Sequence, residues 1–304
     1  MWCKAASALA IVLPAALAQD VEAEAVKYLT DFGYIETNGN TRPFVDETVL
    51  NEAVIKFQDF AGLKKTGRLD EETQELMKTP RCGMDDRVAN FVTQGSNWKS
   101  KAPLYPMLTY RIKKYPTTNR LSRRDVDEET RKAFRMWEES SALQFQEKSS
   151  GQVDIEISFE RFDHGDGNAF DGKGGVLAHA FFPQFGGAAH FDDTEDWSVT
   201  EYVGNQLLNT LTHEFGHSLG LRHSKERNSI MAPFYKGWDP ALKLEEDDIK
   251  GIQAIYGRNK YTDNPTVITP REVLIPTDEL CGSKIDAMLQ TSDGTPYVLI
   301  GDKY

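Results

Sequence analysis

The sequence predicts an α+β protein, in which a small three-helix domain precedes a domain with a mixed, twisted sheet and three further helices. Two observations support this class. Apolar residues between positions 21 and 78 recur only at helical spacing, whereas residues 108–256 alternate between strand-like and helix-like patterns. A polar, proline-containing stretch at 95–106 separates the two regions and is typical of a linker.

The first 18 residues have the pattern of a secretory signal. Lys4 precedes an apolar run, and residues 16–18 have the small-x-small form that signal peptidase cuts. A buried or membrane-spanning helix is the alternative, but the run is too short to cross a bilayer and Pro14 interrupts it. We therefore expect cleavage before Gln19 and a secreted protein. The net charge of −12 disfavours a nucleic-acid binder, and no later run in the sequence is long enough to span a membrane.

The first domain is predicted to contain three helices, over about 25–32, 49–60 and 69–77. Gly62 is expected to end the second helix, and Asp70 is expected to cap the third.

The second domain combines strands and helices. Alternating patterns predict strands over 108–115, 143–148, 153–160 and 176–182. Helices are predicted over 122–141, 206–219 and 245–256, and Ser122 with Asp125 forms a capping box at the start of the first. Glycines and aspartates at 163–175 predict an irregular loop. A hinge rich in proline and threonine follows Gly257, and a β-like stretch begins at Leu280.

Residues 213–223, "HEFGHSLGLRH", carry the pattern of a catalytic metal site. His213 and His217 lie one helical turn apart on the same face, and Gly220 can take a left-handed conformation that turns the chain back and presents His223. Three imidazoles with one open position are typical of catalytic zinc. Glu214 is then the general base for water that attacks a peptide carbonyl. Incidental surface histidines are the alternative, but this spacing is highly specific.

Two further groups of polar residues surround the glycine-rich loop. Three histidines and one aspartate would close a structural zinc site, unless they are solvent-exposed loop residues: His164, Asp166, His179 and His190. Three acids and three backbone carbonyls suit calcium, unless the acids form an ordinary solvated face: Asp171, Asp192 and Glu195, with Gly172, Gly174 and Val176.

Several segments together resemble the matrix metalloproteinases, the matrixin branch of the metzincins. They are "TGRLDEET", "PRCGMDD", "HEFGHSLGLRHS", "SIMAP", "LEEDDIKGIQAIYG" and "ELCGSKIDAMLQTSDGTPYVLIGDKY", and they span almost the whole chain. The resemblance implies the following order: a signal peptide (1–18), a propeptide with peptidoglycan-binding-like helices and a cysteine switch (19–100), a zinc metalloprotease domain (101–258), a hinge (259–279) and the truncated start of a hemopexin-like propeller (280–304).

The same resemblance assigns roles to individual residues. It implies two zinc ions and calcium on the three groups above, with Glu214 as base and Met231 beneath the catalytic zinc. The strand at 176–182 would pair with an extended substrate peptide. The pocket for the side chain after the scissile bond would be bordered by Asn209, Thr210, Pro233 and Tyr235. Implied partners are extracellular protein or peptide substrates, among them matrix components such as collagen, and protein inhibitors; we expect a monomer in the extracellular space or matrix.

Cys82 has two candidate roles. In a propeptide ahead of a zinc ion with one open position, its thiolate would be the fourth ligand and would exclude the attacking water, while Arg81 and Asp86 pair to hold the segment. A disulfide with Cys281 is the alternative. Met84 and Asp85 stand where the family has valine or asparagine and then proline, so the segment could hold less firmly.

Ala188 stands where a further calcium site in the family has a carboxylate, and we do not expect that site here. Parts of the sequence are also compatible with two other functions: a non-catalytic binding module built on the first helices, and a different zinc hydrolase. The complete ligand set, the base and the methionine turn favour catalysis, and the edge strand favours a peptide substrate.

Overall fold

The computed structural model describes residues 15–36, 45–86, 97–100, 107–117, 121–200, 204–259, 287–290 and 296–299. The chain divides into two units, residues 1–259 and 260–304. In the second unit, β9 (Ala287–Gln290) pairs antiparallel with β10 (Pro296–Leu299). The first 14 residues of the predicted signal, Cys281 and most of the predicted hinge and propeller start lie outside the described residues. Among the described helices, none combines the length and hydropathy needed to cross a membrane.

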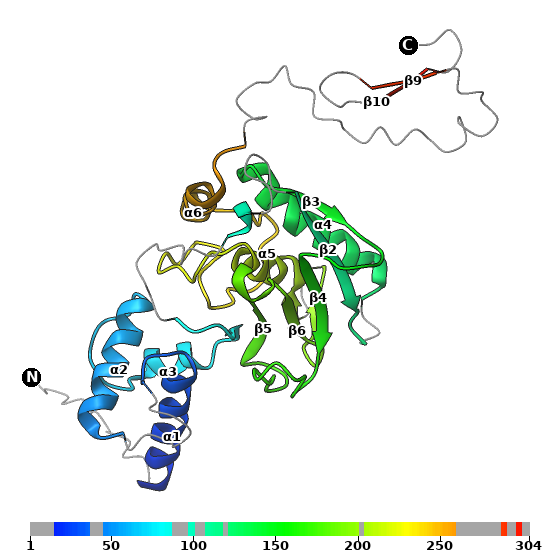
Figure 1. Cartoon of the computed structure of the whole chain (residues 1–304). Coiled ribbons are helices and arrows are strands. Elements are labelled where there is room, and N and C mark those ends of the chain that lie inside the picture. Colours follow the sequence, from blue (N-terminus) through cyan, green and yellow to red (C-terminus); the bar gives the residue numbers. More distant parts are fainter. Residues whose placement is uncertain are drawn as a thin grey trace, which may run out of the picture. The chain divides into compact units, whose positions relative to one another are not determined.

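Three helices form a small bundle at the start of the first unit, as predicted (Figure 1). They are α1 (Ala15–Asp31), α2 (Glu47–Phe60) and α3 (Glu71–Met77). Leu29, Val54 and Phe57 are almost fully buried between them. The Asp70 carboxylate accepts the N–H of Thr73 and caps α3, which confirms the predicted helix start. We call the described residues 15–78 the helical module.

The second domain is built on a six-stranded sheet in the order β1-β5-β6-β4-β2-β3. The strands are β1 (Arg81–Cys82), β2 (Met107–Lys114), β3 (Gln144–Glu147), β4 (Ile155–Glu160), β5 (Val176–Ala180) and β6 (Ala189–Asp192). Neighbours are parallel except β5 and β6. β7 (Trp197–Ser198) and β8 (Asn205–Gln206) form a separate parallel pair. The sequence predicted β2 to β5 but not β1 or β6.

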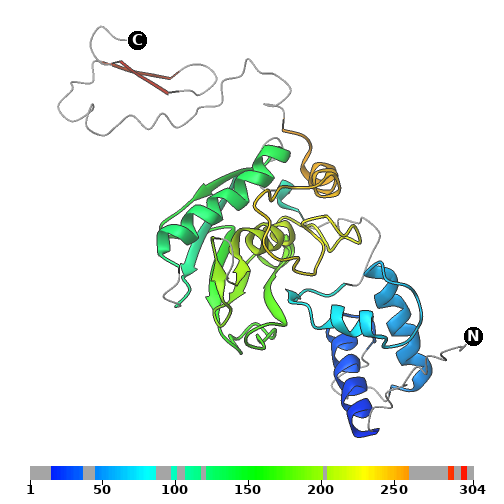
Figure 2. The ribbon, with the colours of Figure 1, turned by 180° about the vertical axis from the view of Figure 1, so that it is seen from behind.

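Three helices complete this part, which we call the sheet domain (residues 97–259). They are α4 (Arg123–Ser140), α5 (Leu207–Ser218) and α6 (Glu246–Tyr256). The capping box of Ser122 and Asp125 opens α4, as predicted. The rings of Phe134 on α4 and Phe215 on α5 stack with their centroids 3.9 Å apart. Because α5 passes through the core, most of its side chains are buried, including those of the histidine motif. Figure 2 shows the same arrangement from behind.

Part of the predicted linker belongs to the core of the sheet domain. Trp98, on the short 3-10 helix η1 (Trp98–Ser100), is buried, and its indole N–H donates to the carbonyl of Ser218 at 2.9 Å. The overall polarity of the stretch predicted a linker. It did not reveal that one large apolar side chain anchors the stretch against the end of α5.

Candidate metal centre and substrate cleft

Helix α5 and the turn after it present three histidines toward one point. His213 and His217 are one turn apart, and the helix ends at Ser218, with Leu219 as its C-cap. Gly220 has φ +103°, the left-handed conformation that the sequence predicted, and the chain reverses there to bring His223 back.

Each of the three rings is oriented through its Nδ1 atom. The Nδ1–H groups of His213 and His217 donate to the carbonyls of Ile230 (2.6 Å) and Leu221 (2.8 Å). The Nδ1–H of His223 donates to the carboxylate of Asp86 at 2.7 Å. The Nε2 atoms therefore face inward, and those of His213 and His217 are 3.2 Å apart. Metal-binding histidines commonly have their ring orientation fixed by such a hydrogen bond from the nitrogen that does not bind the metal.

Cys82 adds a fourth donor atom to this group. Its sulfur is 3.5 Å from Nε2 of His217, and the four ligand atoms of Cys82 and the three histidines lie within 4.8 Å of one another. Burial lowers the pKa of His213 to about 3 and that of His217 well below its ordinary value, so both rings are neutral, as metal ligands must be. Nε2 of His223 is buried and has no hydrogen-bond partner among the described residues. Three nitrogens and one sulfur in this arrangement fit tetrahedral zinc.

Glu214 stands next to this group. It is fully buried, and among the described residues the Cys82 thiol is the one polar group that interacts with its carboxylate. Burial raises its pKa to about 8. A carboxyl group tuned to this range can both take and return a proton at neutral pH.

The methionine turn lies beneath the histidines and is fixed by α6. Asp248 on α6 accepts the backbone N–H groups of Ile230 (2.9 Å) and Met231 (3.1 Å). A Cβ on Gly216 of α5 would overlap the sulfur of Met231, so the glycine leaves room for the close packing. The sequence identified Met231 but missed the role of Asp248, because an acid in the first turn of a helix already has an ordinary explanation.

The second histidine group also comes together. Oδ2 of Asp166 lies 2.9 Å from Nε2 of His164, 2.9 Å from Nε2 of His179 and 2.8 Å from Nδ1 of His190. The histidines come from the glycine-rich loop, β5 and β6. Burial lowers the pKa of His179 to about 4, so this ring is also neutral. The donor set suits a closed metal site.

The three acids of the predicted calcium group share one electrostatic environment. Burial, together with the charges of Asp192 and Asp171, raises the pKa of Glu195 to about 7. Oδ2 of Asp192 is buried and has no hydrogen-bond partner among the described residues. The amide of Gly174, in the same loop as Gly172 and Val176, donates to Glu195 at 2.6 Å. A cation bound by these oxygens would relieve the repulsion between the three carboxylates.

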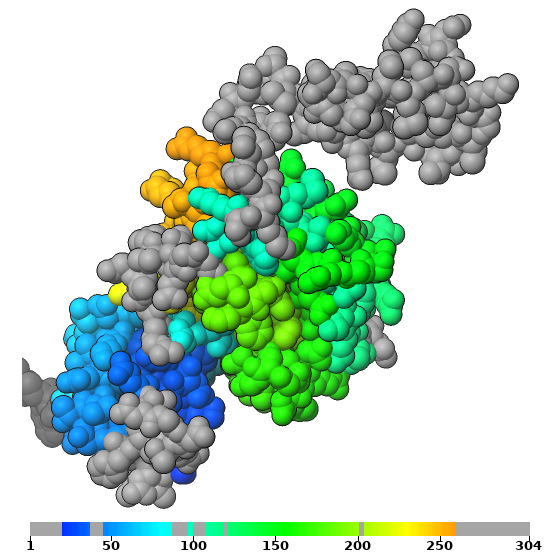
Figure 3. All heavy atoms as spheres, in the orientation of Figure 1, coloured from blue at the N-terminus to red at the C-terminus, as the bar shows by residue number. Residues whose placement is uncertain are grey.

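Residues 79–86, the cysteine segment, lie in an extended cleft of the sheet domain. The N–H of Arg81 donates to the carbonyl of Gly175, the residue before β5, and the N–H of Gly83 donates to the carbonyl of Ala178 on β5, at 2.8 Å each. On the opposite side, the N–H of Cys82 donates to the carbonyl of Pro233 at 3.0 Å. Figure 3 shows the blue and cyan atoms of the helical module and the cysteine segment packed against the green atoms of the sheet domain.

Arg81 and Asp86 form the predicted pair, at 2.6 Å, and both are almost completely buried. The Arg81 guanidinium also lies over the ring of Phe32, the residue that follows α1, at 3.5 Å from the ring centroid. Asp86 accepts the hydroxyl of Tyr34 at 2.8 Å in addition to His223. The pair therefore links the core of the helical module to the third histidine.

The thiol of Cys82 is free and buried. Burial and the neighbouring Glu214 raise its pKa well above the ordinary value, while the N–H of Met84 donates to its sulfur at 3.4 Å. In these surroundings the thiol ionises only when a cation is beside it.

The four residues predicted to border a substrate pocket line one cavity next to Glu214: Asn209, Thr210, Pro233 and Tyr235. The cavity is small while the cysteine segment is in place, because Arg81 and Cys82 form one of its walls. The Tyr235 hydroxyl accepts the N–H of Gln206 at 2.6 Å and holds the loop against the start of α5.

Comparison with known families matches residues 97–257 to the matrixin family of peptidases and residues 22–77 to the peptidoglycan binding domain. Among similar curated proteins, the hatching enzyme of Paracentrotus lividus is 44% identical over 242 residues, covering 79% of this chain and 39% of that protein. The interstitial collagenase of Bos taurus is 42% identical over 271 residues, covering 88% of this chain and 54% of that protein.

The macrophage metalloelastase of Rattus norvegicus is 42% identical over 234 residues, which covers 76% of this chain and 48% of that protein. The chain spans about half the length, or less, of these relatives. The matrixin match covers more than half of the chain and includes both histidine groups. The chain therefore belongs to the matrixin family.

Proposed function

We propose that this chain is the latent precursor of a secreted, zinc-dependent endopeptidase that hydrolyses peptide bonds of extracellular proteins, including matrix components such as collagen. One observation carries the proposal. Three buried histidines converge on one point beside the buried carboxylate of Glu214, in a cleft that an extended segment of the same chain occupies.

The residues divide the catalytic work. His213, His217 and His223 would hold the zinc, which supplies a Lewis acid for the substrate carbonyl and acidifies water. Glu214 accepts the proton of the attacking water and passes it to the leaving amine. Its buried position beside the three histidines supports both steps. The packing of Met231 beneath the histidines keeps their ring positions fixed.

The substrate peptide would take the place of the cysteine segment. β1 already pairs with β5 through backbone hydrogen bonds, which supports strand addition along this edge. The side chain after the scissile bond would enter the cavity bordered by Asn209, Thr210, Pro233 and Tyr235. Relatives named collagenase and metalloelastase support protein substrates.

Cys82 would provide latency as the fourth zinc ligand. Because the segment is tethered and paired on both sides, its thiolate competes with water at a high effective concentration. In this proposal residues 1–18 are the signal, 19–100 the propeptide, 101–258 the catalytic domain, 259–279 a hinge and 280–304 the start of a propeller.

Two further ions complete the proposal. His164, Asp166, His179 and His190 would hold a structural zinc, supported by their shared approach to one carboxylate oxygen. Asp171, Asp192 and Glu195, with the loop carbonyls of Gly172, Gly174 and Val176, would hold calcium, supported by the raised pKa of Glu195. We further propose a monomer that meets protein inhibitors in the extracellular space.

The test uses the full-length chain after removal of the propeptide by an added protease. We expect hydrolysis of a fluorogenic peptide, loss of hydrolysis with a chelator and its return with added zinc. Absence of hydrolysis in the zinc-loaded protein would support a non-catalytic binding module. Hydrolysis of other zinc-hydrolase substrates, but not of peptides, would support a different zinc hydrolase.

A further inference from the structure

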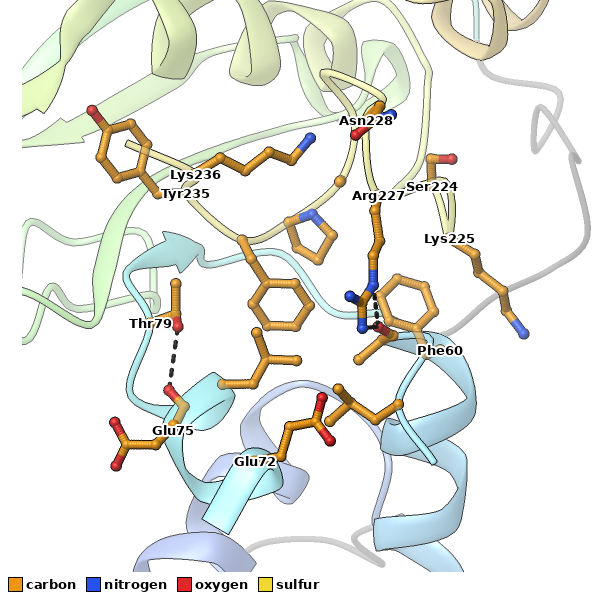
Figure 4. Close-up of a pocket in the computed structure, with 16 residues that line it drawn as sticks. Phe60, Glu72, Glu75, Thr79, Ser224, Lys225, Arg227, Asn228, Tyr235 and Lys236 are labelled. Carbon is orange, nitrogen blue, oxygen red and sulfur yellow. Dashed lines mark hydrogen bonds between the residues drawn. The ribbon is translucent and has the colours of Figure 1, made fainter. Parts of the chain in front are cut away.

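The helical module contacts the sheet domain at a second place, away from the cysteine segment. Here the loop between His223 and Met231 meets the end of α2. Figure 4 shows Arg227 extending from this loop toward the chain that follows Phe60. Its Nε and Nη2 atoms donate to the carbonyl of Ala61 at 3.2 and 3.0 Å, and Nη2 also donates to the carbonyl of Gly62 at 3.1 Å.

These acceptors are well suited to a cation. The carbonyls at the C-terminus of a helix lack partners within the helix, and the helix dipole places partial negative charge there. The last turn of α2 contains no basic residue of its own, so Arg227 of the other domain supplies the charge.

Gly62 makes this close approach possible. Its φ is +67°, and a Cβ at this position would lie 3.2 Å from Nε of Arg227. The glycine therefore both turns the chain after α2 and leaves space for the guanidinium.

Lys225 adds an ion pair at the rim of the same contact. Its Nζ lies 2.9 Å from Oδ2 of Asp59 on α2, whose other oxygen lies 3.0 Å from Lys65. The two lysines and Asp59 are about half exposed, so solvent and salt weaken this pair. The partly buried hydrogen bonds of Arg227 are the stronger component.

A cavity separates this contact from the cysteine segment. Its volume is about 590 Å³, and its lining includes Phe60 of the helical module, Thr79 of the cysteine segment and Arg227 of the loop (Figure 4). The two contacts are therefore spatially distinct, and the rings of Phe57 and Phe234, whose centroids are 6.1 Å apart, also join the helical module to the sheet domain beside the cysteine segment.

We propose that Lys225 and Arg227 form a basic clamp that holds the helical module on the sheet domain independently of the Cys82 thiol. The clamp limits how often the cysteine segment leaves the cleft. Its consequence for latency rests on the proposed function, but the docking itself does not depend on proteolysis.

The experiment measures how fast Cys82 reacts with iodoacetamide in the full-length, zinc-loaded protein, with modification at Cys82 identified by peptide mass mapping. Because Cys82 is buried, the reaction requires the segment to leave the cleft. We expect Arg227→Gln to increase the rate about tenfold, since charge-assisted hydrogen bonds are lost. The control is Lys250→Gln, which removes an exposed lysine that forms an ion pair with Glu246 on the same helix, α6, and its rate should match the wild type.

Two further measurements separate release from unfolding. Hydrogen exchange in Arg227→Gln should increase at the end of α2 but not in α5, whereas general unfolding would increase both. Lys225→Asp should increase the labelling rate about two- to threefold, and adding Asp59→Lys should restore it. A labelling rate for Arg227→Gln equal to the wild type, or faster exchange throughout α5, overturns the clamp. If Arg227→Gln accelerates labelling but no variant hydrolyses peptides, the clamp stands and the proposed function fails.

Discussion

At the scale of single residues, Glu214 is the clearest sign that this site is built for chemistry. An ionised carboxylate without a partner inside a protein is unfavourable, and burial raises the pKa of Glu214 to about 8. Apolar packing would serve stability better at this position. The residue makes physical sense when a cation lies beside it and a proton must be moved.

The first prediction concerns Glu214→Ala. We expect this variant to keep its zinc, because the histidines and their Nδ1 partners are unchanged. Peptide hydrolysis by the activated form should fall by about 10²- to 10⁴-fold, the usual contribution of a general base. Elemental analysis gives the zinc content, and a fluorogenic peptide gives the rate. Activity close to that of the wild type would mean that another residue is the base.

The second prediction concerns Cys82→Ser. A hydroxyl is a much weaker zinc ligand than a thiolate, so the freshly purified full-length variant should hydrolyse a small fluorogenic peptide without added protease. Hydrolysis should increase further when Arg227→Gln is added, because the segment then leaves the cleft more often. A variant as latent as the wild type would show that the thiol is not what closes the site.

At the scale of elements, regular helices and the histidine motif could be predicted, and features that depend on distant partners could not. The spacing of apolar residues predicted α2, and polar residues at the helix starts predicted the caps of α3 and α4, because this information is local. β1 has only two residues and forms through its pairing with β5, so no local pattern marks it. For the same reason the spacing predicted His213 and His217 but not that Asp86 orients His223.

The third prediction concerns the calcium group around the glycine-rich loop. In the calcium-free protein the pKa of Glu195, about 7, exceeds its ordinary value of 4.5, so the calcium-free fold loses stability as the pH rises through this range. Added calcium should therefore raise the melting temperature at pH 7.5 by several degrees. Glu195→Gln with Asp192→Asn should abolish this response without lowering the calcium-free melting temperature. An unchanged response to calcium in the double variant would place the ion elsewhere.

The fourth prediction concerns Asn209 at the start of α5. The cavity beside Glu214 should accept leucine or methionine after the scissile bond, tolerate longer side chains and reject acidic ones. Asn209→Arg should shorten the cavity and reduce cleavage of long-side-chain peptides about 10- to 100-fold relative to short ones. A peptide library compared between the activated wild type and the variant measures this ratio. If the ratio does not change, Asn209 does not limit the depth of the pocket.

At the scale of the whole first unit, three polar contacts hold the helical module and the cysteine segment on the sheet domain, in addition to the packing of Phe234 against Phe57. They are the strand pairing of the cysteine segment, the buried pair of Arg81 and Asp86, and the basic clamp of Lys225 and Arg227. In the sheet domain, all three contacts involve β5 or the chain between His223 and Tyr235. These same segments form the walls of the cleft that holds the cysteine segment. Release of the module therefore changes the site at several points together.

The last prediction places the activating cleavage between about Arg87 and Tyr105. Arg120 and Arg123 form an Arg-x-x-Arg string that resembles a processing site, but Arg123 is the first residue of α4. A cut there would remove β2, which lies between β4 and β3 in the sheet and carries the buried Leu108 and Tyr110.

A cut between Arg87 and Tyr105 leaves β2 intact, and a cut before Trp98 also keeps that side chain packed at the end of α5, as in the uncut chain. N-terminal sequencing of the active form gives the position directly. An active form that begins after Arg123 would contradict the prediction, since the sheet would then have to persist without one of its central strands.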